Sequence, residues 1–322
     1  MNKLSSRRSV LKGLAAGAAG SAWLMNNAAM GAETPAAAPA GGPQKFTVYA
    51  FGHNVWVRVN GRLFTCYRAN PDQKGPYFFP LYGPGTGLPM TEESDEPWPH
   101  HRSLFFGCDK VNGWNFWQEG NDRGQIISRG PKVESPLKDA DKAVITDLCG
   151  WQPPGKDPII EDRRQFTLWA PSPDLRLIDV DITLKALIDI HVAKTNHSLF
   201  AIRCAWNLAP TGGGKLINSE GQSGEKATFG KPAKWCGFEG TRFGVTESIV
   251  MLDHPGNPWA PNCPWFTRDY GNISPTPFLW IDEKGWSLPA GESIRLRYQV
   301  VVMKGGIEKA KLDALWKDFA QG

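Results

Sequence analysis

The residues best suited to chemistry gather in one short stretch of the sequence, residues 97–117. This stretch holds two adjacent histidines, an arginine and three tryptophans, namely His100, His101, Arg102, Trp98, Trp114 and Trp117. Imidazole transfers protons near neutral pH, a guanidinium group fits a carboxylate or a phosphate, and indole rings offer flat apolar faces to a sugar ring. The stretch therefore predicts a carbohydrate pocket. The alternative is the packed start of a strand with one satisfied core histidine.

The geometry of a strand restricts which of these side chains can share a pocket. Neighbouring side chains of a strand point to opposite faces of the sheet. If the strand starts at Pro99, His100 and Arg102 share one face, and His101 and Ser103 share the other. We therefore expect only one of the two histidines to face the ligand.

A third histidine, His254, lies beside a carboxylate in the sequence DHPGN at 253–257. Adjacent residues of an extended segment point apart, so Asp253 does not orient His254 directly. In a turn, which the proline and glycine favour, either side chain can reach the same cleft as His100 or His101. The alternative is that Asp253 only caps a backbone N–H of the turn.

Sugar chemistry at a single carbon needs a general acid and a general base. We expect the acid to be His100, His101 or His254, and the base to be Glu220 or Glu225. Both glutamates lie in the polar segment NSEGQSGE, so a solvated loop charge is the alternative for each of them.

Hydrolysis of a glycoside would instead need two carboxyl groups about 5–10 Å apart. The candidates for this pair are Glu220 and Asp253. A nucleophilic triad is not indicated, because the sequence has neither a GxSxG motif nor a catalytic-cysteine signature. The run TGGGK at 211–215 lacks the spacing of a phosphate-binding loop and is better explained as a turn.

Other polar and aromatic residues are expected to contact the ligand. Arg268 and Asp269 form either a local ion pair that holds a loop or an anion clamp. The predicted ligand-binding residues are Arg102, Trp98, Trp114, Trp117, Asn112, Asn218, Asp253, Asn257, Arg268 and Tyr270.

No cofactor is expected, because the sequence has no HExxH motif and no paired Cys/His spacing. A metal site would need three or four ligands. The alternative is therefore a metal ion held by His100, His101 and His254.

The elements that must position these residues are mostly strands. Strands are predicted near 46–51, 55–59, 63–69, 102–108, 164–170, 177–187, 198–206, 243–252 and 293–303. Residues 178–185 alternate strictly between apolar and polar, which predicts one packed and one wet face, and Asn60-Gly61 predicts a tight hairpin. Only residues 306–320 have a helical period, typical of a terminal helix packed on a sheet. The fold class is therefore all-β, a large antiparallel β-sandwich with a short C-terminal helix.

Four long connections separate these strands, at 70–99, 118–143, 211–235 and 253–277. Long connections in a compact β domain are usually functional. We therefore expect a site built on loops over a rigid sandwich.

The first residues predict export. The segment SRRSVLK, which contains Arg7 and Arg8, is a twin-arginine signature followed by a short apolar run and small residues up to Ala32. We expect a twin-arginine signal peptide at 1–32, a disordered linker at 33–44 and a single domain at 45–322. The product would be periplasmic or secreted, with no membrane attachment after cleavage.

The net charge gives no support for a nucleic-acid partner. The formal charge of the whole chain is +4, and Lys3, Arg7, Arg8 and Lys12 of the predicted leader supply four positive charges. The mature chain is therefore near neutral, without the basic excess typical of nucleic-acid binding.

Several motifs occur together and in one order along the chain: PYFFPL at 76–81, HHR at 100–102, NSEG at 218–221, DHPGN at 253–257 and RDYG at 268–271. In these motifs, and in the Asn-Gly and Phe-Trp pairs after HHR, the sequence resembles the exported PmoA-like family from about residue 45 to 306. The resemblance implies a fold similar to the galactose-mutarotase-like supersandwich and a role in carbohydrate use.

We expect an exported protein that binds or acts on a sugar or glycoside by His/Glu acid–base chemistry, as a glycoside hydrolase, epimerase or lyase. One alternative is a non-catalytic carbohydrate-binding protein. The other, which the label "methane oxygenase PmoA" implies, is a metal-dependent oxidoreductase.

Overall fold

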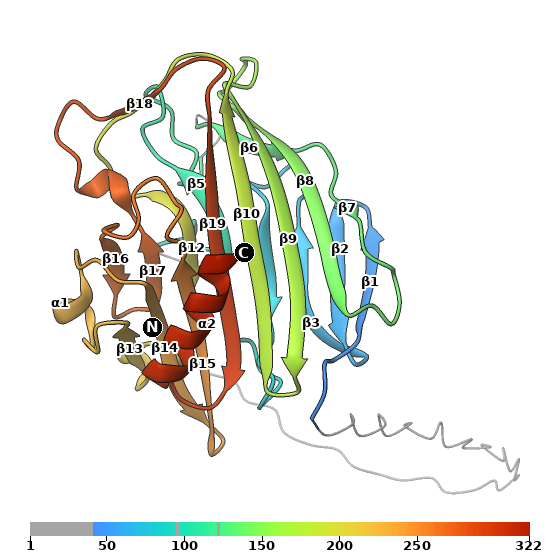
Figure 1. Cartoon of the computed structure of the whole chain (residues 1–322). Coiled ribbons are helices and arrows are strands. Elements are labelled where there is room, and N and C mark those ends of the chain that lie inside the picture. The colour runs from blue at the N-terminus through green and yellow to red at the C-terminus, as the bar shows by residue number, and fades with distance from the viewer. Residues whose placement is uncertain (1–40, 95–96, 121–122) are drawn as a thin grey trace, which may run out of the picture. The chain divides into compact units, whose positions relative to one another are not determined.

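Two large antiparallel sheets packed face to face form the body of the protein (Figure 1). The computed structural model describes residues 41–94, 97–120 and 123–322. The predicted signal peptide at 1–32 and most of the predicted linker at 33–44 lie outside the described residues. No described helix is long and apolar enough to cross a membrane. The predicted large antiparallel β-sandwich is confirmed.

The first sheet has eight strands in the spatial order β1-β2-β3-β4-β5-β12-β17-β16. Asn60 and Gly61 join β2 to β3 with φ values of 46° and 76°, so the predicted tight hairpin is confirmed. The strands are β1 (Phe46–Phe51), β2 (Asn54–Val59), β3 (Arg62–Arg68), β4 (Tyr77–Leu81), β5 (Leu104–Cys108), β12 (Ser198–Arg203), β16 (Trp265–Arg268) and β17 (Asn272–Pro275).

The second sheet has nine strands, in the order β13-β14-β15-β19-β10-β9-β8-β6, with β7 also paired to β8. Its strands are β6 (Gln125–Ser128), β7 (Lys132–Val133), β8 (Lys142–Gln152), β9 (Ile160–Ser172), β10 (Leu175–Ala186), β13 (Lys215–Asn218), β14 (Trp235–Arg242), β15 (Val245–Asp253) and β19 (Ser293–Lys304). A separate pair is formed by β11 (Ile190–Val192) and β18 (Trp286–Leu288).

Alternation along the strands places the main core between the two sheets. On β10, Ile178, Val180 and Ile182 are at most 1% exposed and join the core cluster, whereas Asp179 and Asp181 lie on the outer face. The alternation predicted for 178–185 is therefore confirmed. The same rule gives each sheet an outer face on which polar side chains are free to form a site.

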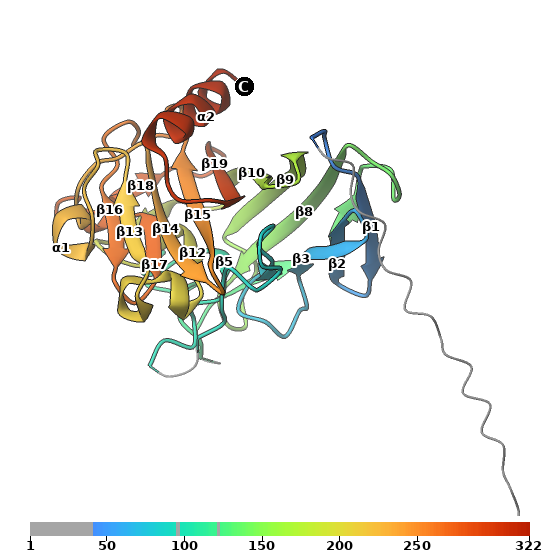
Figure 2. The same ribbon diagram turned by 90° about the horizontal axis from the view of Figure 1, so that it is seen from below.

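The C-terminal helix α2 (Lys309–Gln321) packs on the outer face of the nine-stranded sheet (Figure 2). Leu312 is fully buried there against Leu177 and Val301. The indole N–H of Trp316 donates to the backbone O of Asp253 at 2.8 Å. The predicted terminal helix and its docking on a sheet are confirmed, and the helix starts three residues later than the predicted residue 306.

The four long connections contain more regular structure than predicted. They contain β4, β6, β7, β13, β16 and β17, the short helix α1 (Glu225–Thr228) and the 3₁₀ turn at Pro277–Leu279, while two further 3₁₀ turns lie at Trp206–Leu208 and Pro210–Gly212. The prediction of irregular loops was wrong at these positions. Prolines in YFFPL (77–81) and NISP (272–275) hid two short strands, because proline reduces the strand signal.

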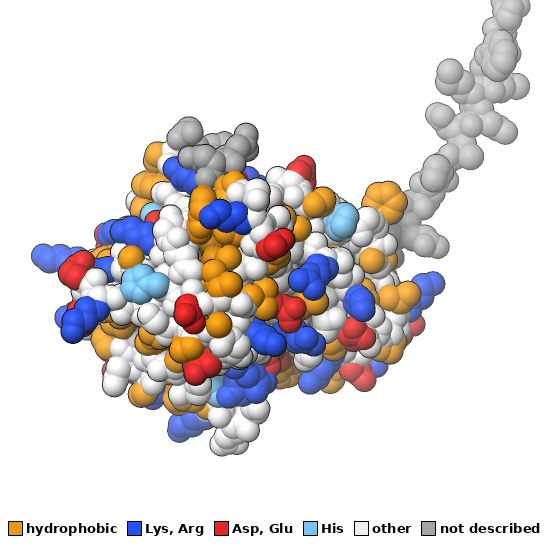
Figure 3. All heavy atoms as spheres, turned by 90° about the horizontal axis from the view of Figure 1, so that it is seen from above, with side chains coloured by type: hydrophobic (Ala, Val, Ile, Leu, Met, Phe, Trp, Pro, Cys, Tyr) orange, Lys and Arg blue, Asp and Glu red, His pale blue; other side chains and the backbone are white. Residues whose placement is uncertain are grey.

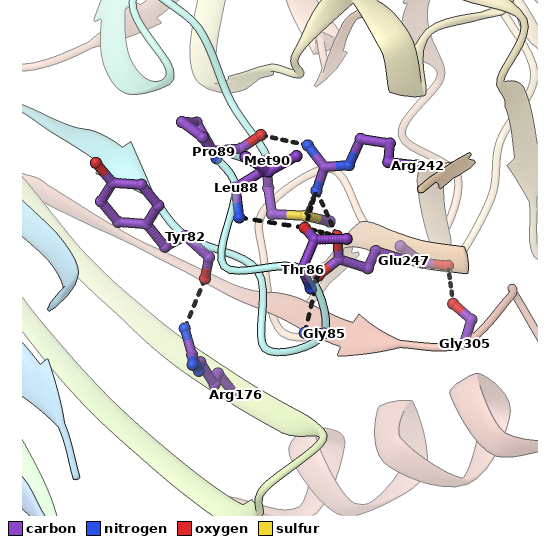
Figure 4. A network of polar contacts seen from close by, with 11 residues as sticks. Tyr82, Gly85, Thr86, Leu88, Pro89, Met90, Arg176, Arg242, Glu247 and Gly305 are labelled. Carbon is purple, nitrogen blue, oxygen red and sulfur yellow. Dashed lines mark hydrogen bonds and ion pairs between the residues drawn. The ribbon is translucent and has the colours of Figure 1, made fainter. Parts of the chain in front are cut away.

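A buried ion pair anchors the segment 83–90 to the nine-stranded sheet (Figure 4). The side chains of Arg242 and Glu247 are 3% and 0% exposed, with 2.5 Å between Nη2 and Oε2. Arg242 Nη1 also donates to the backbone O of Pro89 at 2.6 Å, and the Gly85 N–H donates to Glu247 at 2.9 Å. Both charges are thus paired and hydrogen-bonded, although Nε of Arg242 has no partner among the described residues.

Charged side chains of both signs are mixed on the face shown in Figure 3. Lys and Arg side chains alternate there with Asp and Glu, and no large area of one sign is visible among the described residues. This distribution agrees with the near-neutral charge deduced from the sequence.

Candidate functional site

The candidate site is a cavity of about 400 Å³ on the outer face of the eight-stranded sheet, lined by β16, β17 and the segments that flank β5 and β12. Side chains that point inward from this sheet, such as Phe106 and Phe200, belong to the main core. Outward ones, such as Phe105 and Ala201, form a separate small cluster with Trp117. The cavity is lined by Trp98, His101, Trp117, Asn196, His197, Glu225, Phe266, Arg268, Tyr270, Asn272 and Ser274.

The two adjacent histidines lie in a turn and not in a strand. The His101 N–H donates to the backbone O of Trp98 at 3.0 Å, Ser103 has a φ of 55°, and β5 begins only at Leu104. The predicted assignment of the two histidines to opposite faces of a strand was therefore wrong. Their ring centroids are 4.4 Å apart, and while His101 lines the cavity, His100 is buried beside it.

Aromatic rings form much of the wall. Trp98 and Tyr270 stack with their centroids 4.1 Å apart and an interplanar angle of 17°. The His101 ring lies nearly parallel to both, 6.0 Å from each. On the other side, Trp117 stacks on His197 at 5.8 Å and 21°. Two pairs of rings thus give the cavity rigid, apolar surfaces.

His197 is held next to a carboxylate by the pairing of β5 with β12. Ser198 lies opposite Cys108 in that pair, so the preceding residue, His197, lies opposite Asp109. Nδ1 of His197 is 3.7 Å from Oδ2 of Asp109. Burial by itself raises the pKa of Asp109, but the contacts with His197 and the backbone of Lys110 outweigh it and lower that pKa. The ionised carboxylate lies on the Nδ1 side of the imidazole, so Nε2 is the ring nitrogen on the side away from it.

The histidines His100 and His101 are neutral at physiological pH. Burial lowers the pKa of His100 to about 4, with further lowering by the nearby His197 and Arg123. Burial also lowers the pKa of His101 to about 2, assisted by His100 and Arg203. A neutral imidazole has one donor and one acceptor nitrogen. These two rings are therefore suited to hydrogen bonding with an uncharged group, and not to carrying a proton as cations.

Three buried polar atoms of the cavity lining have no hydrogen-bond partner among the described residues. They are Nδ1 of His101, Nε1 of Trp117 and Oδ1 of Asn272. A buried polar atom without a partner costs about 1–3 kcal/mol, so folded proteins normally pair such atoms. An indole donor, an amide acceptor and an imidazole nitrogen thus lie unpaired just beneath the surface of one cavity.

An ion pair and two hydrogen bonds around Glu225, at the start of α1, fix the rim of the cavity. Glu225 pairs with Arg268 Nη1 at 2.5 Å and accepts the backbone N–H of Asp269 at 3.0 Å. In return, the Glu225 N–H donates to Asp269 Oδ1 at 2.8 Å. Of the two alternatives for Arg268, the structure shows a local ion pair, and the partner is Glu225 and not Asp269.

His254 and Asp253 lie outside this cavity, at the end of β15 in the other sheet. The His254 ring contacts Phe319 of α2 with centroids 4.9 Å apart, and its Nδ1 accepts the Gly256 N–H at 2.8 Å. Asp253 accepts a hydrogen bond from Asn257 Nδ2 at 2.6 Å. The expected convergence of His254 with His100 and the ligand-binding roles of Asp253 and Asn257 are therefore corrected to a structural role beneath α2.

Glu220 and Asn218 also lie outside the cavity, in the turn that follows β13. Asn218 is fully buried, and its Oδ1 accepts the backbone N–H groups of Glu220 and Gln222 at 3.1 and 3.0 Å. The side chain of Glu220 accepts a hydrogen bond from Ser219 at 2.9 Å. Asn218 thus shapes the turn. The structure does not bring the predicted base Glu220 to the histidines, nor into one cavity with Asp253.

Arg102 is near the cavity but its charge is already paired. Its Nε donates to Glu119 at 2.9 Å, and its Nη1 lies 3.7 Å from Glu93. The guanidinium also lies over the ring of Tyr77, 5.5 Å from the centroid. Arg102 thus lies beside the cavity and not in its lining, and its contact with a ligand stays a prediction.

Asn112 and Trp114 belong to the turn that follows β5. Trp114 packs against the main core and contacts Lys156, whose Nζ lies 5.2 Å from the ring. Asn112 donates to the backbone O of Asp189 at 2.9 Å and accepts the His191 N–H at 2.7 Å. Asn112 thus links its turn to β11 and Trp114 packs on the core, so neither of these predicted ligand contacts lies in the cavity.

Nothing in the described part of the chain is arranged to hold a metal ion, because no group of three or more His, Cys, Asp and Glu side chains converges there. The alternative of a metal at His100, His101 and His254 fails because the third histidine lies in the other sheet.

The sequence did not reveal Asp109, Asn196, His197, Phe266, Asn272 and Ser274 as residues of the site. His197 is a single histidine in the run KTNHSLF, which has no motif spacing. Its neighbours come from three other strands. Only the register of β5, β12 and β17 reveals that they share one face.

One protein family matches most of the chain. A family model described as "Family of unknown function (DUF6807)" matches residues 54–317. No curated protein matches the sequence. The family description gives no activity, so the oxygenase label of the resemblance stays a prediction.

Solved structures similar in arrangement include two epimerases and a glycosidase. A putative aldose 1-epimerase from Escherichia coli K12 is 11% identical, with 82% of this chain and 100% of that chain covered and a TM-score of 0.35. A galactose 1-epimerase from Lactobacillus acidophilus NCFM is 7% identical, with 83% and 100% covered and a TM-score of 0.40. A GH36 alpha-galactosidase from Geobacillus stearothermophilus, in complex with stachyose, is 10% identical, with 81% and 40% covered and a TM-score of 0.34. At such identities and scores, no argument about activity rests on this likeness.

Proposed function

Because the chain belongs to the DUF6807 family of unknown function, we propose a function from the geometry of its cavity: it binds a sugar there and acts on it by acid–base chemistry. The observation that carries the proposal is the set of unpartnered polar atoms on His101, Trp117 and Asn272 inside an aromatic wall. Small-molecule sites combine apolar walls with a few convergent polar groups. A sugar ring, with apolar C–H faces and hydroxyl groups around its edge, has the complementary chemistry.

His197 is the proposed proton-transfer residue. Nδ1 faces Asp109, so Nε2 can take a proton from a sugar hydroxyl or C–H and give it to the oxygen of the C–O bond that breaks. Asp109 stabilises the imidazolium that forms in between. His101 stays neutral and hydrogen-bonds the substrate. This assignment moves the acid–base role from the His/Glu pair expected from the sequence to a His–Asp pair.

The reaction class that fits is one at a single sugar centre, such as epimerisation or elimination. Hydrolysis needs two carboxyl groups, and the lining formed by the described residues has one carboxylate, that of Glu225, which is already paired with Arg268. Glu225 and Arg268 at the rim set the orientation of the sugar and do not attack it.

The second candidate function is carbohydrate binding without turnover. The Trp98–Tyr270 stack and the polar atoms of the lining suit it equally well, because neither requires a proton transfer. The two candidates differ in what they require of His197.

The test uses a panel of neutral hexoses, hexuronates and disaccharides, measured by calorimetry for binding and by mass spectrometry and NMR for product. H197A should abolish turnover with a change in affinity below about tenfold, since one neutral hydrogen bond is worth about 0.5–1.5 kcal/mol. W98A should weaken binding. H191A is the matched control, because His191 is exposed and lies outside the cavity.

Binding without product, unchanged in H197A, would leave the non-catalytic candidate. No binding of any panel sugar by the wild type, or equal binding in W98A, would refute the cavity as a sugar site.

We also propose that the protein works outside the cytoplasm, exported by the twin-arginine pathway. The support is the sequence around Arg7 and Arg8 and the apolar run that follows it. An exported location would bring the cavity into contact with sugars outside the cell.

A further inference from the structure

A second concave surface lies on the opposite side of the sandwich, on the outer face of the nine-stranded sheet. It is a groove of about 710 Å³ over β8, β9, β10 and β19. None of the residues proposed to bind or act on the sugar contributes to it. Its lining includes Arg129, Lys132, Glu134, Gln165, Thr183 and Arg295.

The strand register arranges the groove as two rows that run across four strands. The first row is Leu148, Arg163, Thr183 and Arg295. The second row is Thr146, Gln165 and Asp181, and Arg297 continues it on β19 beyond the groove lining. Strands lie about 4.8 Å apart, so each row is about 14 Å long. Seven of these eight side chains are polar or charged. The groove is therefore long, straight and rich in hydrogen-bonding groups.

Helix α2 covers the apolar part of the same face and leaves these rows uncovered. Leu177 and Val301 are buried under the helix with Leu312. Figure 2 shows α2 at the β15–β19 side of the sheet. The boundary between the two parts lies where the outward side chains change from apolar to polar, as expected if only the apolar part evolved to be packed.

The arginines of the groove extend outward, and the carboxylates beside them are recessed. The side chains of Arg163, Arg295 and Arg129 are 73%, 58% and 53% exposed, whereas those of Glu161 and Asp181 are 25% and 30% exposed. Glu161 is shared, because Arg129 and Arg163 each lie 3.8 Å from it. Glu134, next to β7, is an exposed carboxylate of the lining. A ligand that approaches over β9, β10 and β19 therefore meets guanidinium groups first.

We propose that this groove binds a linear glycan chain that carries carboxylates, a polyuronate. Guanidinium forks bind carboxylates in a bidentate way. Arg295 already forms such a pair with Asp181, whereas Arg129 and Arg163 lie 3.8 Å from Glu161 and keep their donors for a ligand. Gln165, Thr183 and Thr146 lie between the arginines and can bond the hydroxyl groups of the sugar units. A single sugar would contact only part of a row, whereas a chain of several units follows its whole length.

A nucleic acid fits the groove less well. Its closely spaced phosphates need a large cationic excess, but here Glu134, Glu161 and Asp181 lie among the arginines. No aromatic ring is part of the two rows, so unpaired bases would find no stacking surface. One charge per sugar unit, with hydroxyl groups between, matches the mixed character of the rows.

The test measures binding of the full chain to polygalacturonate, with highly methyl-esterified polygalacturonate and duplex DNA as comparison ligands. The double variant R163Q/R295Q should lower the affinity for polygalacturonate at least about tenfold. K215Q/K304Q is the matched control, since Lys215 and Lys304 are 66% and 50% exposed and each pairs with one carboxylate elsewhere. It removes the same charge and should change the affinity less than about twofold. R163Q alone serves if the double variant does not fold.

Three results would overturn the inference. They are no binding of polygalacturonate by the wild type, an equal loss in K215Q/K304Q, or equal affinity for the esterified chain or for DNA. W98A separates this surface from the proposed sugar cavity, because it should leave polygalacturonate binding unchanged. Loss of panel-sugar binding and loss of polygalacturonate binding are thus distinguishable failures.

Discussion

Replacement of Trp117 by phenylalanine tests whether its indole N–H serves a ligand. Trp117 is 4% exposed, and its Nε1 has no hydrogen-bond partner in the described chain. Trp235 provides the matched comparison, because it is fully buried and its Nε1 donates to Asp313 at 3.0 Å. W117F and W235F each keep an aromatic ring and remove an indole N–H. The two variants therefore share a packing loss and differ in the lost hydrogen bond.

The packing loss is similar at both sites. Tryptophan to phenylalanine removes about three buried carbon-sized groups, which costs about 2–3 kcal/mol at ~0.8 kcal/mol per group. In W235F the lost bond to the Asp313 carboxylate adds roughly 1–2 kcal/mol. In W117F the removal of an unpaired buried donor offsets about 1–3 kcal/mol of the packing loss. W117F should therefore change stability by between a gain of about 1 kcal/mol and a loss of about 2 kcal/mol, and W235F should lose about 3–5 kcal/mol.

The two variants should differ in ligand binding as well, and here W117F should have the larger loss. W117F should weaken binding of the panel sugar about 3–10-fold, the equivalent of one neutral hydrogen bond, and W235F should leave it unchanged. Urea denaturation gives the free energy of unfolding and calorimetry gives the affinity. If W117F loses as much stability as W235F while binding is unaffected, Trp117 is a core residue and the argument from unpartnered atoms is refuted.

Three further predictions concern stability and export. E247Q should lose about 3–5 kcal/mol of unfolding free energy, because it leaves the buried cation of Arg242 unpaired. D141N removes a charge from an exposed pair and should lose less than about 1 kcal/mol. Equal losses in urea denaturation would contradict this prediction. Burial raises the pKa of Asp253 to about 7, although a hydrogen bond from Asn257 lowers it. The wild type therefore loses stability from this group as the pH rises from about 4 to about 7. D253N should gain stability relative to the wild type across that window in pH-dependent melts, and a constant difference would refute the assignment. R7K/R8K should retain the protein in the cytoplasm in cell fractionation, and unchanged export would refute a twin-arginine leader.

Local features of the sequence predicted the fold well. The alternation at 178–185, the Asn60-Gly61 turn and the period of the last helix each depend on residues close together in the chain. Their conformations follow from side-chain direction and backbone preference, which are local properties. The short strands in YFFPL and NISP were missed because their stability comes from neighbouring strands and not from their own composition.

The site was predicted in part, for the same reason. The stretch 97–117 pointed to His101, Trp98 and Trp117, since one turn and the strand after it hold all three near each other. The motif RDYG pointed to Tyr270. His254 was grouped with them by chemical type, and the pairing of β15 with β19 places it in the other sheet, beneath α2.

The sequence by itself determined that this protein is a β-sandwich with an aromatic, histidine-bearing segment, because periodicity and residue type are written along the chain. Only the tertiary structure decided that His197 faces Asp109, that Arg102 pairs with two carboxylates, and that His254 packs against helix α2. These facts depend on which strands pair and in which register, and a shift of one residue would turn each side chain to the opposite face.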